Sequence, residues 1–217
     1  MRAALIMARA PRPGETNTRL EPLLGPSGCA RLQAALIRHT AAWVATAAER
    51  AWVAFTPRDA RAEIAALVPA DTTLLEQRGD DLGARLRFAT GDVFEEHAGP
   101  LAVVGTDAPL LGPAHFRAAA EELRRGADAA LVPALDGGYA LIALARPAPQ
   151  AFSLPAGAWG GADVLALTLN ALRRDGRSCA VLAPVRDLDT ADDALALFAD
   201  PRCPAGVRAA LSAARAP

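Results

Sequence analysis

The sequence predicts one α/β domain with a mostly parallel central β-sheet flanked by helices. Strand-like and helix-like segments alternate along the chain, and this order requires crossovers that return each strand to the same sheet. Several of the strand-like runs are apolar at consecutive positions, which is typical of strands buried on both faces. A length of 217 residues fits a single domain of this kind.

The expected strands are short apolar runs bounded by turn residues. They cover 3–8, 51–56, 72–76, 101–105, 129–133, 140–145 and 179–183. The expected helices cover 29–48, 59–67, 82–96, 114–125 and 163–174. A short helix is expected at 194–198, and a weak helix or tail at 201–217.

Capping residues support several of these boundaries. Ser27 or Gly28 is expected to open the first helix, and Pro113 suits the first turn of the helix that follows it. Thr190 and Asp193 have the spacing of a capping box before the short helix at 194–198.

Composition excludes several classes of function. The formal net charge is −1, so we expect neither a nucleic-acid surface nor an acidic tail. The basic side chains are arginines, and no lysine is available for a Schiff base or a phosphate contact. Cys29, Cys179 and Cys203 are widely spaced, which argues against a disulfide framework or a zinc site. No apolar run has the length of a signal peptide or a membrane span, so we expect a cytoplasmic protein without membrane association.

Asp107 is the leading candidate for a functional residue. It follows the buried strand expected at 101–105, and Pro109 prevents further strand pairing. Open α/β sheets bind ligands beyond the carboxyl ends of their strands, and a carboxylate there needs compensation, for which a cation is suitable. Asp107 lies too far upstream to cap the helix near Pro113, so we expect it to contact a ligand.

The loop 10–20 follows the first strand and is expected at the same edge of the sheet. Thr16, Asn17 and Arg19 offer hydrogen-bond donors, and a loop in this place commonly holds phosphate. It matches neither a Walker motif nor a GxGxxG motif. An ordinary polar turn would have a similar composition, so the pattern alone leaves both interpretations open.

Two glycine-containing loops are expected beside it. In 77–85, Asp80 or Asp81 is suited to cap the following helix, whereas Gly79 and Gly83 would let a flat ligand approach the backbone. In 135–139, two adjacent glycines follow Asp136 and permit either an ordinary turn or close ligand contact.

A second acidic segment covers 186–193. Asp192 and Asp193 suit the charge preference of a helix start, but Asp187 and Asp189 precede that helix and need another explanation. Asp107 together with Asp189 or Asp187 would offer the oxygen ligands that Mg²⁺ prefers. Trp159 belongs either to the core or to an acceptor pocket.

These segments together resemble the DUF2064 family of GT-A-fold, glycosyltransferase-like proteins, across roughly 1–198. The wider group is similar to phospholactate guanylyltransferase and the molybdenum-cofactor nucleotidyltransferases. The motifs that carry the resemblance are the loop 11–20, the loop 79–85, Gly105-Thr106-Asp107-Ala108-Pro109, Asp136-Gly137-Gly138-Tyr139, Trp159 and Asp187-Leu188-Asp189-Thr190.

The resemblance implies a Rossmann-like GT-A nucleotide-diphospho-sugar transferase fold over 1–217, with a nucleotide-binding half at 1–110 and an acceptor-binding half at 111–200. It implies Mg²⁺ or Mn²⁺ at Asp107 and Asp189, and catalytic roles for Asp107 and Asp136. The nucleotide or phosphate contacts it implies are Arg12, Gly14, Thr16, Asn17, Arg19, Gly79, Asp81 and Gly83. The acceptor contacts it implies are Gly137, Gly138, Tyr139 and Trp159.

Asn17 departs from the family pattern, which usually has lysine there. An amide donates a hydrogen bond but carries no charge to offset a triphosphate. We therefore expect a metal-dependent glycosyltransferase with a nucleotide-sugar donor and a small-molecule acceptor. The alternatives are a nucleotidyltransferase that transfers NMP from NTP, and a nucleotide-binding protein without turnover. A homodimer is compatible with each of them.

Overall fold

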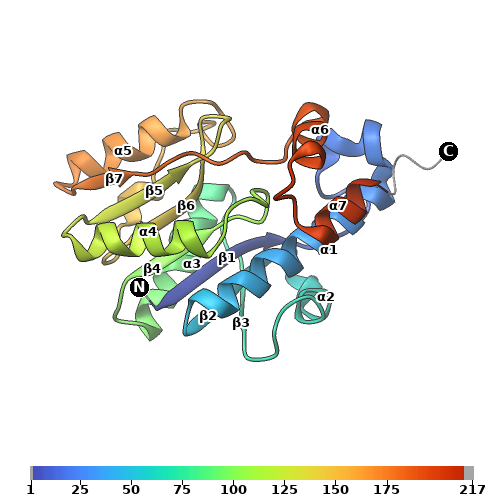
Figure 1. Cartoon of the computed structure of the whole chain (residues 1–217). Helices are drawn as coiled ribbons and strands as arrows, with labels where there is room; N and C mark the ends of the chain where they lie inside the picture. The colour runs from blue at the N-terminus through green and yellow to red at the C-terminus, as the bar shows by residue number, and fades with distance from the viewer. Residues whose placement is uncertain (1, 213–217) are drawn as a thin grey trace.

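The computed structural model of the chain describes residues 2–212 and has the α/β architecture expected from the sequence (Figure 1). Its strands are β1 (Ala3–Arg9), β2 (Arg50–Thr56), β3 (Thr73–Glu76), β4 (Leu101–Val104), β5 (Ala129–Pro133), β6 (Tyr139–Leu144) and β7 (Cys179–Val181). Its helices are α1 (Glu21–Ala47), α2 (Arg61–Ala65), α3 (Leu82–Glu96), α4 (Pro113–Arg124), α5 (Val164–Arg174), α6 (Ala191–Ala199) and α7 (Ala205–Ser212). Short 3-10 helices cover Thr18–Leu20, Arg58–Ala60 and Pro149–Phe152.

The strands form one mostly parallel sheet in the order β3-β2-β1-β4-β6-β5-β7. Strand β6 is antiparallel to both of its neighbours, and the other pairs are parallel. The connection from β5 to β6 is too short for a crossover, so these two strands form a hairpin. The carboxyl ends of β1, β4, β5 and β7 therefore lie at one edge, together with the start of β6.

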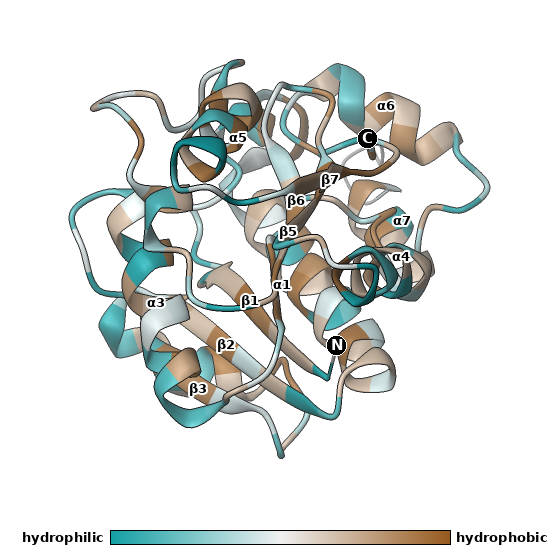
Figure 2. Cartoon of the chain, turned by 90° about the vertical axis from the view of Figure 1, so that its left-hand side faces the viewer, coloured by the Kyte–Doolittle hydropathy of each residue, from teal (hydrophilic) through white to brown (hydrophobic). Residues whose placement is uncertain are grey.

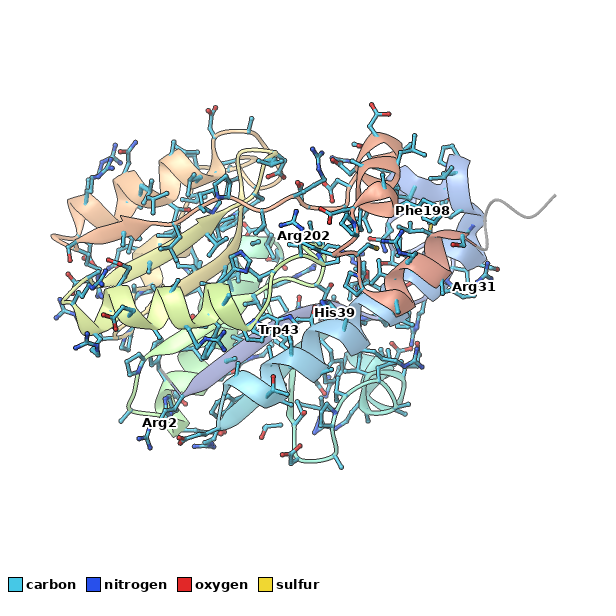
Figure 3. All side chains as sticks on the ribbon, viewed as in Figure 1. Arg2, Arg31, His39, Trp43, Phe198 and Arg202 are labelled. Atoms are coloured by element: carbon cyan, nitrogen blue, oxygen red, sulfur yellow. The ribbon has the colours of Figure 1, made fainter. Side chains whose placement is uncertain are left out.

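Helices cover both faces of the sheet. Helices α1 and α4 pack on one face, and α3 and α5 pack on the other (Figure 2). Helix α2 packs on the same face as α1 and α4. Trp43 of α1 and Phe116 of α4 meet edge to face, with their ring centroids 6.3 Å apart, where the two helices are neighbours (Figure 3). Because both faces are covered, the central strands are apolar at nearly every position.

A third apolar cluster extends the core beyond the sheet. The first half of α1 packs against α6 and α7 through Leu32, Leu36, Leu197 and Val207 (Figure 1). Leu188, in the segment between β7 and α6, is buried in the same cluster. This packing holds the acidic segment 186–193 close to the carboxyl edge of the sheet.

Most expected boundaries are confirmed, and α1 is the main exception. The expectation that Ser27 or Gly28 opens the first helix is wrong, because α1 begins at Glu21. Gly25 interrupts it with φ 65° and ψ 165°, and the helix resumes at Pro26, which suits a first helical turn. The capping box of Thr190 and Asp193 is present, with both reciprocal hydrogen bonds.

The expected terminal helix is present as α7, whereas 213–217 and residue 1 lie outside the described residues. Within 2–212, no helix combines the length and the apolar character needed to cross a bilayer.

Candidate active site

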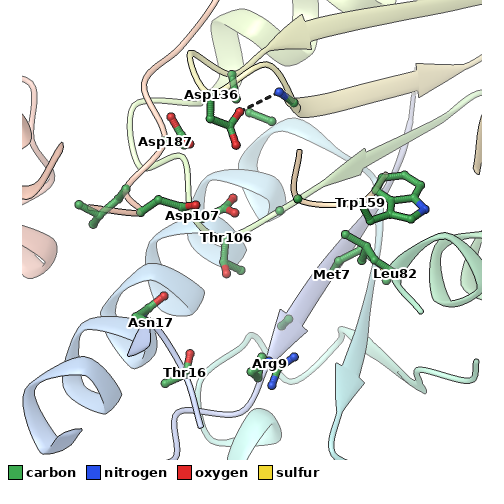
Figure 4. Close-up of a pocket in the computed structure, with 18 of the residues that line it drawn as sticks. Met7, Arg9, Thr16, Asn17, Leu82, Thr106, Asp107, Asp136, Trp159 and Asp187 are labelled. Atoms are coloured by element: carbon green, nitrogen blue, oxygen red, sulfur yellow. Dashed lines mark hydrogen bonds between the residues drawn. The ribbon is translucent and has the colours of Figure 1, made fainter. Parts of the chain in front are cut away.

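A cleft of about 590 Å³ opens at the carboxyl edge of the sheet (Figure 4). Five segments line this cleft: the loop after β1, the loop between β3 and α3, the loop after β4, the β5–β6 turn and the segment after β7. The polar residues that sequence analysis proposed and that line this cleft are Thr16, Asn17, Arg19, Asp107, Asp136, Tyr139, Trp159, Asp187 and Asp189. The loops 10–20 and 105–109, which we expected at the same edge of the sheet, both line this cleft.

Three carboxylates gather at one end of the cleft. Asp136, Asp187 and Asp189 each place an oxygen within 4.8 Å of the other two. Asp136 lies in the β5–β6 turn, where its Oδ1 accepts a 2.8 Å hydrogen bond from the Gly138 amide. Asp187 and Asp189 alternate about the buried Leu188, so their side chains can point the same way.

The Asp107 loop is tied directly to this acidic segment. The backbone carbonyl of Asp107 accepts a 2.8 Å hydrogen bond from the Leu188 amide. Asp107 is not one of the three closely grouped carboxylates, but it is near enough to interact electrostatically with Asp189 and Asp136. Of the metal pair expected from sequence, Asp189 thus belongs to the close group and Asp107 lies beside it.

Three carboxyl groups of the cleft, those of Asp107, Asp187 and Asp189, have raised pKa values. Burial raises the pKa of Asp187 to about 6, and the neighbouring Asp136 adds to the shift. Asp107 is open to the cleft, yet crowding by protein atoms, followed by the charges of Asp189 and Asp136, raises its pKa to about 6 as well. The pKa of Asp189 is also raised, mainly by burial, although Arg19 opposes that shift.

This arrangement fits a divalent cation. Carboxylate oxygens are the preferred ligands of Mg²⁺, and oxygens on opposite sides of one such ion are separated by roughly 4 Å, twice the Mg–O distance. The ligand oxygens of Asp136, Asp187 and Asp189 lie within 4.8 Å of one another, so side-chain rotations would bring them around one ion. A cation would also offset the burial and the mutual repulsion that raise the pKa values of Asp187 and Asp189.

Arginines line the same cleft near the first loop and α3. Arg19 forms an ion pair with Asp189 at 3.2 Å and so links the first loop to the acidic group. Arg9, at the end of β1, donates to the carbonyl of Glu15 at 3.3 Å. Arg85 of α3 donates to the carbonyl of Gly79 at 3.1 Å. The cleft therefore places guanidinium groups and carboxylates around one space, as a phosphate–metal complex requires.

Asn17 lies beneath this space in a left-handed backbone conformation, with φ 49° and ψ 38°. Asparagine tolerates this conformation better than most residues. Its Nδ2 donates to Oε1 of Gln33 at 3.0 Å, so the side chain is engaged within the protein. The position at which the resemblance led us to expect lysine therefore holds a residue that binds a neighbouring helix.

Several expected contact residues lie outside the residues that line the cleft, namely Arg12, Gly14, Gly79, Asp81, Gly83 and Gly137. Arg12 pairs with Glu63 at 2.6 Å and with Asp59 at 3.1 Å. Asp81 caps α3, because its Oδ1 accepts from the Ala84 amide at 2.7 Å. These pairings explain both residues as parts of the scaffold around the site.

Gly83 and Gly137 are required by close backbone packing. A Cβ on Gly83 would lie 2.4 Å from Nε1 of Trp159, so glycine lets the indole ring rest on the start of α3. A Cβ on Gly137 would lie 2.0 Å from the carbonyl oxygen of Ala162, and its φ is 94°. Each glycine thus shapes the cleft by letting a neighbouring segment approach.

An apolar side of the cleft faces away from the carboxylates. Met7, Leu82 and Trp159 lie near one another there, and Trp159 is half-buried (Figure 4). Tyr139 also lines the cleft, but its hydroxyl is buried toward Thr168 of α5. Burial raises the pKa of the Tyr139 hydroxyl, so this group stays protonated.

Sequence reasoning did not single out Arg9, Gln33, Gln77 and Thr106, which also line the cleft. Arg9 and Thr106 are at carboxyl ends of strands, so the strand-end rule could have found them. Gln33 lies within α1, and no local pattern distinguishes it from a surface residue.

Comparison with known proteins places the chain in a family. A family model described as "Uncharacterized protein conserved in bacteria (DUF2064)" matches residues 39–159, more than half of the chain. The chain belongs to the DUF2064 family. No match was found among curated proteins.

Solved structures share the fold of this DUF2064 member. A "putative nucleotide-diphospho-sugar transferase" from Desulfovibrio desulfuricans G20 is 26% identical, with a TM-score of 0.87, over 98% of this chain and 95% of that one. A nucleotidyl transferase (Mth528) from Methanothermobacter thermautotroptrophicus is 18% identical, with a TM-score of 0.61, over 91% and 95% of the two chains. Rv0371C from Mycobacterium tuberculosis H37Rv, solved with manganese, is 18% identical, with a TM-score of 0.53, over 89% and 96%. The expected nucleotide-diphospho-sugar transferase fold is confirmed.

Proposed function

We propose that this protein is a metal-dependent transferase with a nucleotide-activated donor, and specifically a glycosyltransferase that uses a nucleotide diphosphate-sugar. The observation that carries the proposal is the close group of Asp136, Asp187 and Asp189 in the same cleft as two arginines, Arg9 and Arg19, the second of which is paired with Asp189. The name of the Desulfovibrio desulfuricans structure and its coverage of nearly the whole chain support the same class of reaction.

Each side of the cleft has a role in this proposal. Asp136, Asp187 and Asp189 would hold Mg²⁺ or Mn²⁺, and the structure of Rv0371C with manganese supports such a metal in this fold. Arg9 and Arg19 would contact the diphosphate through charge-assisted hydrogen bonds. The bound metal would supply electrostatic stabilisation of the charge that builds on the leaving phosphate.

Asp107 is assigned here as the general base. It lies beside the metal group and is open to the cleft, where its carboxylate can accept the proton of an acceptor hydroxyl. Asp107 would take the proton of the acceptor hydroxyl while that oxygen bonds to the sugar carbon and the sugar–phosphate bond breaks. The nucleoside diphosphate leaves with the bonding electron pair. Relative to the expectation from sequence, Asp107 and Asp136 exchange their roles of metal ligand and base.

The apolar side of the cleft would receive the acceptor or the planar part of the donor. Trp159 and Tyr139 present ring surface there, and Gly138 borders the same turn. The Tyr139 hydroxyl takes no part in proton transfer in this proposal, because it is buried toward α5.

A thermal-shift panel tests the proposal, because a ligand that binds only the native state raises the melting temperature. We expect nucleotide diphosphate-sugars to stabilise the protein in the presence of Mn²⁺ or Mg²⁺ and to do so much less after chelation. Product analysis then separates the reactions: free nucleoside diphosphate marks glycosyl transfer, and pyrophosphate released from NTP marks nucleotidyl transfer. Binding without either product would indicate a nucleotide-binding protein without turnover.

A further inference from the structure

Gln33 makes three hydrogen bonds at the floor of the cleft. Its side chain is buried, with 4% of the residue exposed, on α1. Its Nε2 donates to the backbone carbonyl of Arg9 at 3.1 Å and to Oγ1 of Thr106 at 3.2 Å, and its Oε1 accepts from Nδ2 of Asn17 at 3.0 Å. Both N–H groups and the carbonyl oxygen of the Gln33 side-chain amide therefore have hydrogen-bond partners.

Two of the partners of Gln33 belong to loops with different roles in the proposed function, namely the first loop, which carries the diphosphate contact Arg19, and the loop that carries the proposed base Asp107. Asn17 is in the first loop (residues 10–20), and Thr106 directly precedes Asp107 in the Asp107 loop (residues 105–109). In the described part of the chain, no hydrogen bond joins these two loops directly. The amide of Gln33 bridges them from a helix that packs on the sheet.

We propose that Gln33 is a positioning residue that couples the first loop to the Asp107 loop. Buried, fully paired amides hold their partners in one geometry, because breaking any bond leaves a polar group unsatisfied in a low dielectric. Gln33 touches no reacting atom. It transmits order between the loop around Asn17 and the loop around Asp107, which is bonded through Leu188 to the segment of the proposed metal ligands Asp187 and Asp189. A bound metal therefore strengthens nucleotide binding at the first loop. This inference rests on the proposed function for its ligands.

Two substitutions separate coupling from general stability. Gln33→Met keeps an unbranched side chain of similar length and removes all three hydrogen bonds. Gln33→Glu keeps an acceptor for Asn17 and removes the donors to Arg9 and Thr106, and it serves if the first variant fails to fold. Ile37→Ala is the matched control, because Ile37 lies one turn further along α1, fully buried in the core and outside the cleft.

The first measurement is the ratio of nucleotide Kd values without and with Mn²⁺, determined by calorimetry at a temperature where each variant is folded. Coupling between sites is typically 5- to 150-fold. We expect this ratio to fall at least about fivefold in Gln33→Met, and to change less than about twofold in Ile37→Ala at a similar loss of melting temperature. An unchanged ratio in Gln33→Met, or an equal fall in Ile37→Ala, would overturn the proposal.

The second measurement needs no ligand. Hydrogen exchange reports on the Leu20 amide, which is bonded to the Asn17 carbonyl, and on the Leu188 amide, which is bonded to the Asp107 carbonyl. We expect both amides to lose protection together in Gln33→Met, by about tenfold more than in Ile37→Ala, on the scale of one or two lost hydrogen bonds. Retained protection at either amide would overturn the coupling. If metal does not enhance nucleotide binding by the wild-type protein, the proposed function is refuted. The hydrogen-exchange measurement alone would then decide whether Gln33 couples the two loops.

Discussion

Removing the charge of Asp187 should stabilise the metal-free protein while weakening its response to metal. Asp187 is 7% exposed, and burial followed by the nearby Asp136 raises its pKa from 3.8 to about 6. A shift of this size corresponds to about 3 kcal/mol of destabilisation when the group is ionised, at 1.36 kcal/mol per pKa unit. Asp187→Asn keeps the size of the side chain and removes that charge.

The sign follows from proton linkage. The folded state holds the Asp187 proton more tightly than the unfolded state, so ionisation disfavours folding as pH rises from about 4 to 6. At pH 7.5, without metal, we expect Asp187→Asn to unfold at a melting temperature roughly 6–12 °C above wild type, since 1 kcal/mol shifts a protein of this size by about 2–4 °C. The difference should shrink toward zero as pH falls to about 4.

Differential scanning fluorimetry across pH 4–8, with chelator and then with Mn²⁺, measures both effects. Wild type should gain stability on adding Mn²⁺, and Asp187→Asn should gain much less, because it has lost a proposed ligand. Asp71→Asn, at an exposed position before β3, controls for a general loss of negative charge. A variant less stable than wild type at pH 7.5, or a difference independent of pH, would refute the reasoning.

Three further substitutions test other parts of the site. Asp107→Asn should lower the rate of nucleoside diphosphate release from a bound nucleotide-sugar by about 10²-fold or more, as expected for loss of a general base. It should leave the Mn²⁺ affinity within a few-fold of wild type. A large loss of Mn²⁺ affinity in titrations would make Asp107 a metal ligand instead. Arg19→Gln should tighten Mn²⁺ binding in the absence of nucleotide, measured by electron paramagnetic resonance, because it removes the ion pair with Asp189. The same variant should weaken nucleotide binding. If Mn²⁺ affinity and nucleotide affinity changed in the same direction, these roles would be contradicted. Asn17→Lys should tighten binding of an NTP more than binding of the matching nucleotide-sugar, most strongly at low salt. The variant also loses the Gln33 contact, but this loss affects both ligands and cancels in the ratio of the two affinities. An unchanged ratio would mean that position 17 does not face the phosphates.

Local patterns predicted most of the scaffold. Helix α3 has the expected bounds, because an N-cap, Asp81, precedes an amphipathic run. The predicted start of α1 lies too far along the chain. Gly25 and Pro26 have the pattern of a helix start, but the turn that precedes them is helical as well. Strand β6 was located, but its direction depends on pairing with β4 and β5, which alternation alone does not specify.

The site was predictable where it depends on the ends of strands. Asp107 and Asp136 were found because buried strands end beside them. Arg12 was proposed as a phosphate contact, whereas its partner Glu63 is 51 positions away, and no local signal reveals such a pair. Gln33 was missed for a similar reason, because its role depends on partners in two distant loops.

The placement of the tryptophans gives the cleft an optical signal of its own. Trp43 and Trp52 are buried in the core, where emission is insensitive to a ligand at the carboxyl edge, and a water-soluble quencher reaches them poorly. Trp159 is half-exposed at the apolar side of the cleft. The part of the intrinsic fluorescence that acrylamide quenches therefore comes from Trp159 and reports on this cleft alone. A ligand ring bound against Trp159 should protect it from quenching. The variant Trp159→Phe, which lacks this signal, is the control.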